Sequence, residues 1–218
     1  MDIVDFGTPL GLAFASGLNA YLPMLAYALS VRWLHLFTVN PHFAFITQTW
    51  CIVALAFLTL IDFVADKIPL IDHAWNAIHT AVRPIAGAVV AVVASSHALP
   101  VTHIQAVAAS TGSGTIIAAL SAVPITGIGL LVILVIGAAL AALSHSAKST
   151  TRFVSTLTTA GLLNGILSLG EDVLVLIVIL LSLFASAVML ILLVALVLIL
   201  VPRFLRFRKP WMGKRGLF

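Results

Sequence analysis

The chain has 218 residues, of which 62% are hydrophobic and only 8% are charged. Soluble domains carry about a quarter of charged residues, and one core of this size could not bury so much apolar surface. Composition therefore excludes an ordinary soluble domain and predicts an all-α, polytopic membrane protein, because helices satisfy their own backbone groups in lipid. At about 20 residues per crossing, we expect about six transmembrane helices.

The net charge of +4 comes from the C-terminus, because six of the eleven Lys and Arg residues lie in the last sixteen positions. Basic residues beside an apolar run mark the cytoplasmic end of a span and attract anionic lipid head groups. We therefore expect one transmembrane domain over residues 1–202 and a basic cytoplasmic tail over 203–218. No nucleic-acid-binding pattern accompanies these charges. The basic residues of the tail are Arg203, Arg206, Arg208, Lys209, Lys214 and Arg215.

The N-terminus is acidic at Asp2 and Asp5, whereas a secretory signal begins with basic residues. We therefore expect the first apolar segment to remain in the mature protein. Cys51 is the only cysteine, which excludes an intramolecular disulfide, a cysteine zinc site and a redox pair.

A first span is predicted from about Thr8 to Val31. Asn19, Tyr21 and Pro23 interrupt it and predict a local break near its middle.

A second span is predicted from about Phe45 to Val64, and a segment of 14 residues between Pro69 and Pro84 follows it. That segment is too short to cross a bilayer. Its polar residues recur every three or four positions and share one helical face, which predicts a short interfacial or re-entrant helix. They are Asp72, Asn76, His79 and Arg83.

An apolar Ala/Val segment runs from Pro84 to Ser95, and a loop around His97, Pro100 and His103 follows. A weakly apolar segment, Ala106 to Val123, precedes a clear span from Ile125 to Leu143. Ser149 to Ser168 is predicted to form the second short polar-faced helix. The last span is predicted as one helix of 29 residues, Val173 to Val201.

Two halves of the chain, about 1–100 and 101–202, look alike at an offset of 81 residues. The offset places Lys67 over Lys148, and Arg83-Pro84 over Asn164-Gly165. Three crossings in each half would give an inverted repeat, a recurrent design in secondary transporters. Lys67 and Lys148 would then approach the membrane from opposite faces, with both termini in the cytoplasm.

Charged residues inside the apolar layer are costly, about 2.5–3.5 kcal/mol each, and usually pair in the protein interior. We interpret them as a polar pathway for a proton, an ion or an anionic group. The alternative is that they pin helix ends at the interface, which we prefer for Arg32 and Asp72. A helix start would also explain Glu171 and Asp172. The candidate pathway residues are Asn19, Tyr21, Asp62, Asp66, Lys67, Arg83, His145, Lys148, Arg152, Asn164, Glu171 and Asp172.

A metal site or an enzyme is not predicted. His73 and His79 are six residues apart and do not share a helical face. HExxH and GxSxG are both absent from the sequence. We expect no cofactor.

Several motifs together resemble a bacterial family of small membrane proteins that is catalogued as a domain of unknown function, number 4126. The first-half motifs are Ser16-Gly17-Leu18-Asn19-Ala20-Tyr21-Leu22-Pro23, Asp66-Lys67-Ile68-Pro69 with Asp72 and Trp75, and Arg83-Pro84-x-Ala86-Gly87. The second-half motifs are Ala142-x2-His145-x-Ala147-Lys148-x3-Arg152 and Ser168-x2-Glu171-Asp172. The sequence departs from the pattern at Asn19, where we expect a basic residue. The resemblance supports the candidate residues and implies no activity.

Our first hypothesis is a small transporter or channel-like protein that moves an ion or a small anionic solute between two halves. The alternatives are a scaffold or accessory subunit of a membrane complex and, third, an intramembrane enzyme acting on lipid. We expect the bacterial cytoplasmic membrane as its location. The sequence leaves homo-oligomerisation open.

Overall fold

The computed structural model describes residues 6–39, 41–67, 69–95, 116–159 and 164–212. All regular structure within these ranges is helical, which confirms the predicted all-α class. The helices are α1 (Gly7–Ser16), α2 (Leu22–Arg32), the 3-10 helix η2 (Pro41–Thr47), α3 (Thr49–Ala65), α4 (Pro69–Ser95), α6 (Ile116–Thr159), α7 (Asn164–Phe184) and α8 (Ser186–Met212).

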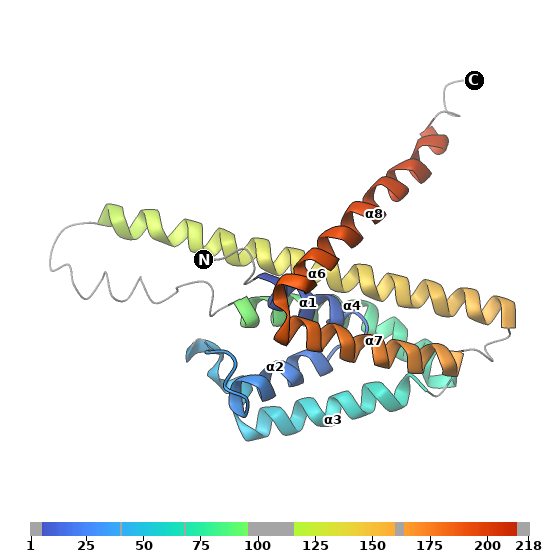
Figure 1. The fold of residues 1–218 in the computed structure, drawn as a ribbon, viewed down its shortest axis with the longest axis horizontal. Coiled ribbons are helices and arrows are strands. Elements are labelled where there is room, and N and C mark those ends of the chain that lie inside the picture. Colours follow the sequence, from blue (N-terminus) through green and yellow to red (C-terminus); the bar gives the residue numbers. More distant parts are fainter. Residues whose placement is uncertain (1–5, 40, 68, 96–115, 160–163, 213–218) are drawn as a thin grey trace.

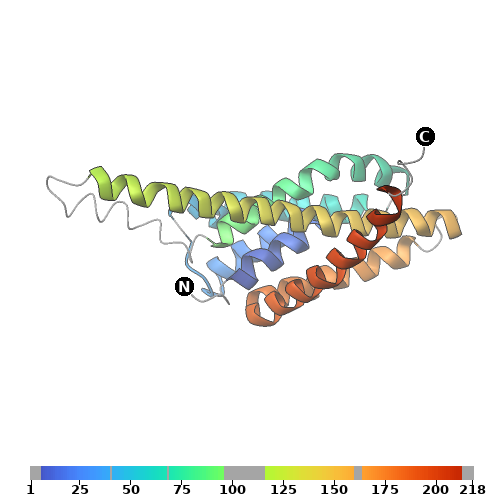
Figure 2. The same ribbon diagram turned by 90° about the horizontal axis from the view of Figure 1, so that it is seen from above.

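Four helices, α3, α4, α6 and α7, lie along one another as a bundle, and α8 leaves it at an angle (Figures 1 and 2). α3 and α6 run in one direction, and α4 and α7 return (Figure 1). Lys67, after α3, forms an ion pair with Asp172 near the start of α7. Asp66, its neighbour, pairs with Lys148 near the end of α6. The predicted approach of Lys67 and Lys148 from opposite faces is therefore wrong: the α3–α4 and α6–α7 pairs are parallel, not inverted.

The first predicted span is instead a helical hairpin. Thr8, at the start of α1, donates a hydrogen bond to Ser182 O at 2.7 Å. Arg32, at the end of α2, donates to Thr49 Oγ1 at 3.0 Å. Ser182 and Thr49 belong to the same end of the bundle, so the chain turns back between α1 and α2 (Figure 1). Each helix is about 15–17 Å long, half of the roughly 30 Å hydrocarbon core.

The turn of the hairpin, residues 17–21, is where the sequence predicted a break. Asn19 Oδ1 accepts hydrogen bonds from the backbone amides of Tyr21, at 3.2 Å, and Leu22, at 2.9 Å. Pro23 lies in the first turn of α2, where its missing N–H costs no hydrogen bond. The break was predicted correctly. The direction of the following helix was not.

α4 continues through Pro84 to Ser95, so the prediction of a separate short helix ending at Arg83-Pro84 is wrong. A proline removes one backbone hydrogen bond, and packing against neighbouring helices makes this tolerable in a membrane helix. That packing is close here: a Cβ on Gly87 would lie 2.9 Å from Gly137 O of α6. The small residues hold α4 against α6 across the proline.

The second half also differs from the prediction. The short helix predicted over Ser149–Ser168 does not exist, because α6 extends to Thr159 and α7 begins at Asn164. The single helix predicted over Val173–Val201 is divided at Ala185 between α7 and α8. α8 continues to Met212 and so includes the first ten residues of the predicted tail, 203–212.

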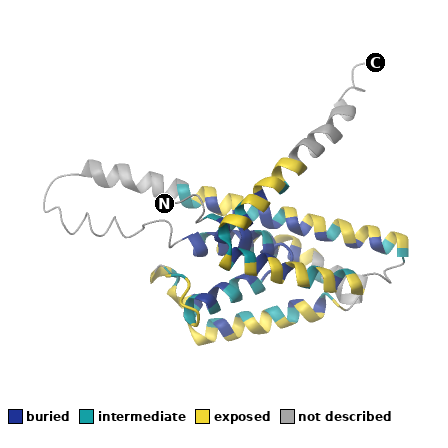
Figure 3. Ribbon diagram, viewed as in Figure 1, coloured by how far each residue is buried: buried dark blue, intermediate teal, exposed yellow. Residues whose placement is uncertain are grey.

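Three helices among the described residues are long and apolar enough to cross a membrane, or four if η2 and α3 form one bent span. We expected about six transmembrane helices. One of the predicted crossings, the first, is instead the α1–α2 hairpin. Large apolar side chains are exposed along α3, α6, α7 and α8, as lipid-facing surfaces are (Figure 3). The predicted loop at His97–His103 and the first ten residues of the Ala106–Val123 segment lie outside the described residues.

We predict that Gly137→Leu destabilises the protein whereas Gly129→Leu on the same helix does not. A Cβ on Gly137 would lie 2.7 Å from Gly87 O, while a Cβ on Gly129 would meet no atom within 4 Å. Overpacking of this kind costs about 1–3 kcal/mol. Thermal unfolding of both purified variants tests this, and equal melting temperatures would contradict the close α4–α6 contact.

Candidate functional site

Eight charged side chains from four helices meet around the tip of the α1–α2 hairpin. We call them the charged cluster. Four are acidic and four are basic, so their formal charges sum to zero. Arg83 and Asp62 have no exposed surface, and Lys148 and Arg152 are only 4% and 6% exposed. The members are Asp62, Asp66, Lys67, Arg83, Lys148, Arg152, Glu171 and Asp172.

Asp66, which caps the end of α3, is the centre of the cluster. It forms an ion pair with Lys148, lies 3.4 Å from Arg152 Nη2, and lies 3.7 Å from Arg83 Nη2. Burial alone would raise the pKa of the Asp66 carboxyl, but Lys148, Arg152 and Arg83 together outweigh it and hold that pKa below its usual value. Asp66 is therefore an anion near neutral pH.

Glu171 of α7 pairs with Lys148 and Arg152, two of the three cations that surround Asp66. Arg152 Nη2 donates to Glu171 Oε2 at 2.6 Å and Arg152 Nε donates to Oε1 at 3.3 Å. Lys148 Nζ lies 3.4 Å from Glu171 Oε2. The helix-start explanation of Glu171 and Asp172 is wrong, because α7 begins seven residues before Glu171 at Asn164. Ion pairs with Lys67, Lys148 and Arg152, and not the start of a helix, hold the carboxylates of Glu171 and Asp172 in position.

Lys67 and Asp172 form the outer edge of the cluster. Lys67 Nζ lies 2.8 Å from Asp172 Oδ2 and donates to Ser168 Oγ at 3.3 Å. The ammonium also lies 4.0 Å above the Phe63 ring, at cation–π distance. The side chains of Lys67 and Asp172 are 34% and 25% exposed, so this pair is accessible where the other pairs are not.

The hairpin tip supplies backbone groups to the cluster. Arg83 Nη1 donates to Gly17 O at 3.4 Å, and Lys148 Nζ donates to Leu18 O at 3.0 Å. Ala20 N donates to Asp62 Oδ2 at 3.3 Å. Carbonyls at the end of one helix therefore bind cations, and an amide just before the next binds an anion, as the helix dipoles favour.

Asp62 Oδ1 is bound from α4. Trp75 Nε1 donates to it at 2.8 Å, and His79 Nε2 and Arg83 Nη2 each lie 3.5 Å from it. Our candidate residues omitted Trp75 and His79. The spacing could have identified them, because Trp75, His79 and Arg83 recur every four residues and so share one face of α4.

His145 of α6 contacts Arg83 from the opposite side. Arg83 Nη1 lies 3.1 Å from His145 Nδ1, and His145 Nε2 lies 3.3 Å from Thr80 Oγ1. A guanidinium can only donate, so Nδ1 accepts and the proton of this neutral imidazole is on Nε2. His145 thereby helps to position the buried guanidinium.

The remaining predicted residues surround the cluster without joining it. Asn19 caps α2, and the Tyr21 ring meets the His79 ring edge-on at 6.0 Å. Asn164 begins α7, but its side chain and that of Asp72 lie outside the description. Arg32 binds Thr47 O and Thr49 at the far end of the hairpin, away from the cluster.

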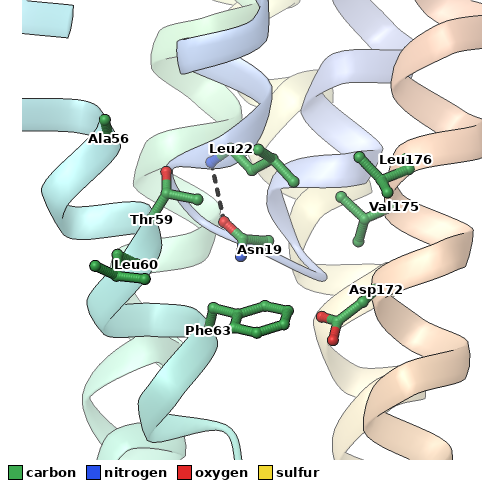
Figure 4. A pocket seen from close by; sticks show the side chains of 9 residues that line it. All are labelled: Asn19, Leu22, Ala56, Thr59, Leu60, Phe63, Asp172, Val175 and Leu176. Atoms are coloured by element: carbon green, nitrogen blue, oxygen red, sulfur yellow. Dashed lines mark hydrogen bonds between the residues drawn. The ribbon is translucent and has the colours of Figure 1, made fainter. Parts of the chain in front are cut away.

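A cavity of about 310 Å³ lies between α2, α3 and α7, beside the hairpin tip (Figure 4). Its walls are apolar except at Asn19, Thr59 and Asp172. It reaches the outer edge of the charged cluster through Asp172. The remaining lining residues are Leu22, Ala56, Leu60, Phe63, Val175 and Leu176.

In the described part of the chain, no group of three His, Cys, Asp or Glu side chains lies close enough together to hold a metal ion. The cluster consists of buried and partly buried acidic and basic side chains, groups that can bind ions and exchange protons.

The model of one protein family matches the chain over residues 7–125 and again over 102–206, so it covers both the hairpin and the charged cluster. The family is described as a domain of unknown function, DUF4126. The chain belongs to the DUF4126 family. No curated protein and no solved structure matched this DUF4126 protein in the comparisons.

In this DUF4126 protein we predict that Lys148→Met is far more destabilising than Lys67→Met. Lys148 is buried against Asp66 and Glu171, and removing one partner of a buried pair costs about 3–5 kcal/mol. Lys67 is part-exposed, and such a pair contributes about 0–1 kcal/mol. Thermal unfolding in the same detergent compares the two, and equal losses would contradict a buried cluster.

We also predict that Asp66 makes stability fall in acid. Because the pKa of Asp66 is lowered on folding, its contribution is complete above the unfolded value of about 3.9 and disappears as the pH falls through the lower, folded value. Asp66→Asn should be less stable than the wild type at pH 7, and the difference should shrink towards about pH 3. Melting temperatures across this range test it. A difference that is constant with pH would contradict the assignment.

Proposed function

We propose that the chain is a small membrane transporter that moves an ion or a small anionic solute past the charged cluster. One observation carries the proposal: backbone groups at the tip of a half-length helical hairpin bind charged side chains deep in an apolar bundle. Ionisable groups inside membranes usually belong to ion or substrate pathways. Interrupted helices supply backbone groups to transporter sites in the same way.

The cluster favours an anionic cargo over a cationic one. Asp66 occupies a position that is ringed by Lys148, Arg152 and Arg83, and Asp62 accepts a hydrogen bond from the amide of Ala20. These are the interactions that bind a carboxylate or an inorganic anion. A solute with the same charge can take these partners when an aspartate moves or is protonated.

We propose a membrane arrangement in which α3, α4, α6, α7 and α8 cross the bilayer. The α1–α2 hairpin enters and returns, which lipid allows only because protein covers its turn. Gly17, Leu18, Asn19 and Ala20 are all buried, in agreement with this placement. The basic residues in the last turns of α8 and after it favour a C-terminus in the cytoplasm of a bacterial cell. The ends of α3 and α6 share that side.

An accessory subunit is the second candidate. The observation that favours it is the pairing of each charge in the cluster with an opposite charge, since a purely structural network would show the same. Mutual ion pairs are, however, a poor way to stabilise a fold, because apolar residues of similar size usually do as well or better.

The test uses purified protein in liposomes on a solid-supported membrane. Concentration jumps of chloride, nitrate, phosphate, sulfate and acetate should give at least one transient current. Arg83→Gln should reduce that current at least about tenfold, which corresponds to about 1.4 kcal/mol. Arg32→Gln, which alters an arginine outside the cluster, should leave the current unchanged.

Wild type that gives neither a current nor a pH change inside dye-loaded liposomes, beyond that of protein-free liposomes, with any of the five anions would contradict anion transport. Equal currents from Arg83→Gln and wild type would contradict the cluster as the pathway. A defined membrane complex that co-purifies with the silent protein would favour the accessory subunit.

A further inference from the structure

His79 has a hydrogen-bonding arrangement that its neutral form cannot satisfy. Its Nδ1 lies 3.0 Å from the backbone carbonyl of Trp75. A carbonyl only accepts, so Nδ1 must carry a hydrogen. In the neutral ring Nε2 then has no hydrogen and presents a lone pair. That atom is buried, the residue is 1% exposed, and among the described residues Nε2 has no hydrogen-bond partner.

The lone pair of Nε2 faces a carboxylate. Asp62 Oδ1 lies 3.5 Å from it, and the side chain of Asp62 is fully buried. Two acceptors at this distance repel each other, and the His79 Nε2 atom is left without a donor. One added proton removes the conflict, whether it resides on Nε2 or on the Asp62 carboxyl, because either form gives a hydrogen bond between the two atoms.

We propose that His79 and Asp62 form a proton-binding site that holds one proton between Nε2 and Oδ1. The proton belongs to the pair, as in other strongly coupled carboxylate–imidazole sites. The site is distinct from His145, whose two ring nitrogens both have partners of the right kind.

The groups around His79 determine how the proton acts on the rest of the cluster. Arg83 is the key one, because its Nη2 lies 3.5 Å from Asp62 Oδ1, and Nη2 and Nε have no hydrogen-bond partner among the described residues. Lys148 approaches from α6 through its pair with Asp66. The ionisable groups that face His79 are Tyr21 from the hairpin, Asp62 and Asp66 from α3, Arg83 from α4, and His145 from α6.

The bound proton changes the charge of the cluster from zero to plus one. It also engages the carboxylate that Arg83 faces, so the two free donors of the guanidinium become available to an anion. Proton binding and anion binding must then strengthen each other by the same factor. This consequence deepens the transport proposal and rests on it: the cargo would be an anion that moves together with a proton. The proton site itself does not require transport.

The fluorescence of Trp75 can report whether the His79–Asp62 site holds its proton. Its ring centroid lies 4.7 Å from that of His79, and its Nε1 donates to Asp62 Oδ1. An imidazolium quenches indole fluorescence more strongly than a neutral imidazole, and the indole hydrogen bond changes when Asp62 is protonated. The chain has four tryptophans, so Trp33, Trp50 and Trp211 are replaced by Phe to leave Trp75 alone.

The experiment is a fluorescence titration of this single-tryptophan protein in detergent, from about pH 4 to 9 to cover carboxylate and imidazole titration. We expect one reversible step. His79→Gln should remove it. Asp62→Asn should also remove it, because the neutral amide lacks the carboxylate that shares the proton with Nε2. His42→Gln, an exposed histidine outside the cluster, should retain the step.

A folded wild type whose Trp75 fluorescence is flat over this range would overturn the proposal. So would a step that survives in both His79→Gln and Asp62→Asn. If one variant fails to fold, the other decides. One proton moving with a monovalent anion carries no net charge, so anion movement is also followed by the pH inside dye-loaded liposomes. A fluorescence step in a protein that gives neither an anion current nor such a pH change would keep the proton site and refute transport, whereas anion movement without a step would refute the proton site alone.

Discussion

The structure depends on what happens to the backbone at residues 17–21. Where a helix stops inside an apolar bundle, its last carbonyls and the first amides of the next helix lose their partners, and each unpaired group costs several kcal/mol in lipid. Here Arg83 and Lys148 donate to Gly17 O and Leu18 O, and Asp62 accepts from Ala20 N. The dependence is mutual: the charged side chains satisfy the backbone groups of the hairpin, and the hairpin supplies the polar partners that buried ions require. Each part supplies partners for polar groups that would otherwise be buried and unpaired.

Close packing of small residues allows this arrangement. Gly17 meets Ala141 and Ser144 of α6, and Gly87 meets Gly137, so the hairpin, α4 and α6 approach without large side chains between them. That proximity makes a network of ion pairs possible between residues 82 positions apart, such as Asp66 and Lys148. It also explains why the pairs are so well covered. Among the described ion pairs of the charged cluster, the Lys67–Asp172 pair, next to the cavity of Figure 4, is the most exposed.

Much of the charged cluster could be predicted from the sequence, because isolated charges in an apolar chain must find one another. All eight members were among the candidates. Direction was harder to predict: a break at Asn19 is visible in the sequence, but whether the chain goes on or turns back depends on tertiary packing. The predicted helix end at Pro84 was wrong for a related reason. α4 continues through the proline because it packs closely against α6, and this packing cannot be read from the sequence of α4 alone. The spacing places His79 on the helical face of Arg83 and could have added it to the candidates, but only atomic positions reveal that its Nε2 faces the Asp62 carboxylate.

The central claim is that the first apolar segment returns to the side from which it entered. Cys51 is the only cysteine, so Cys51→Ser gives a background for single cysteines on each side of the hairpin, Phe6→Cys before α1 and Leu34→Cys after α2. A membrane-impermeant maleimide is applied to spheroplasts and, separately, to inside-out vesicles. The account predicts that both cysteines are labelled in the same preparation. Labelling of one only in spheroplasts and the other only in inside-out vesicles would show that the segment crosses the membrane, and would contradict it.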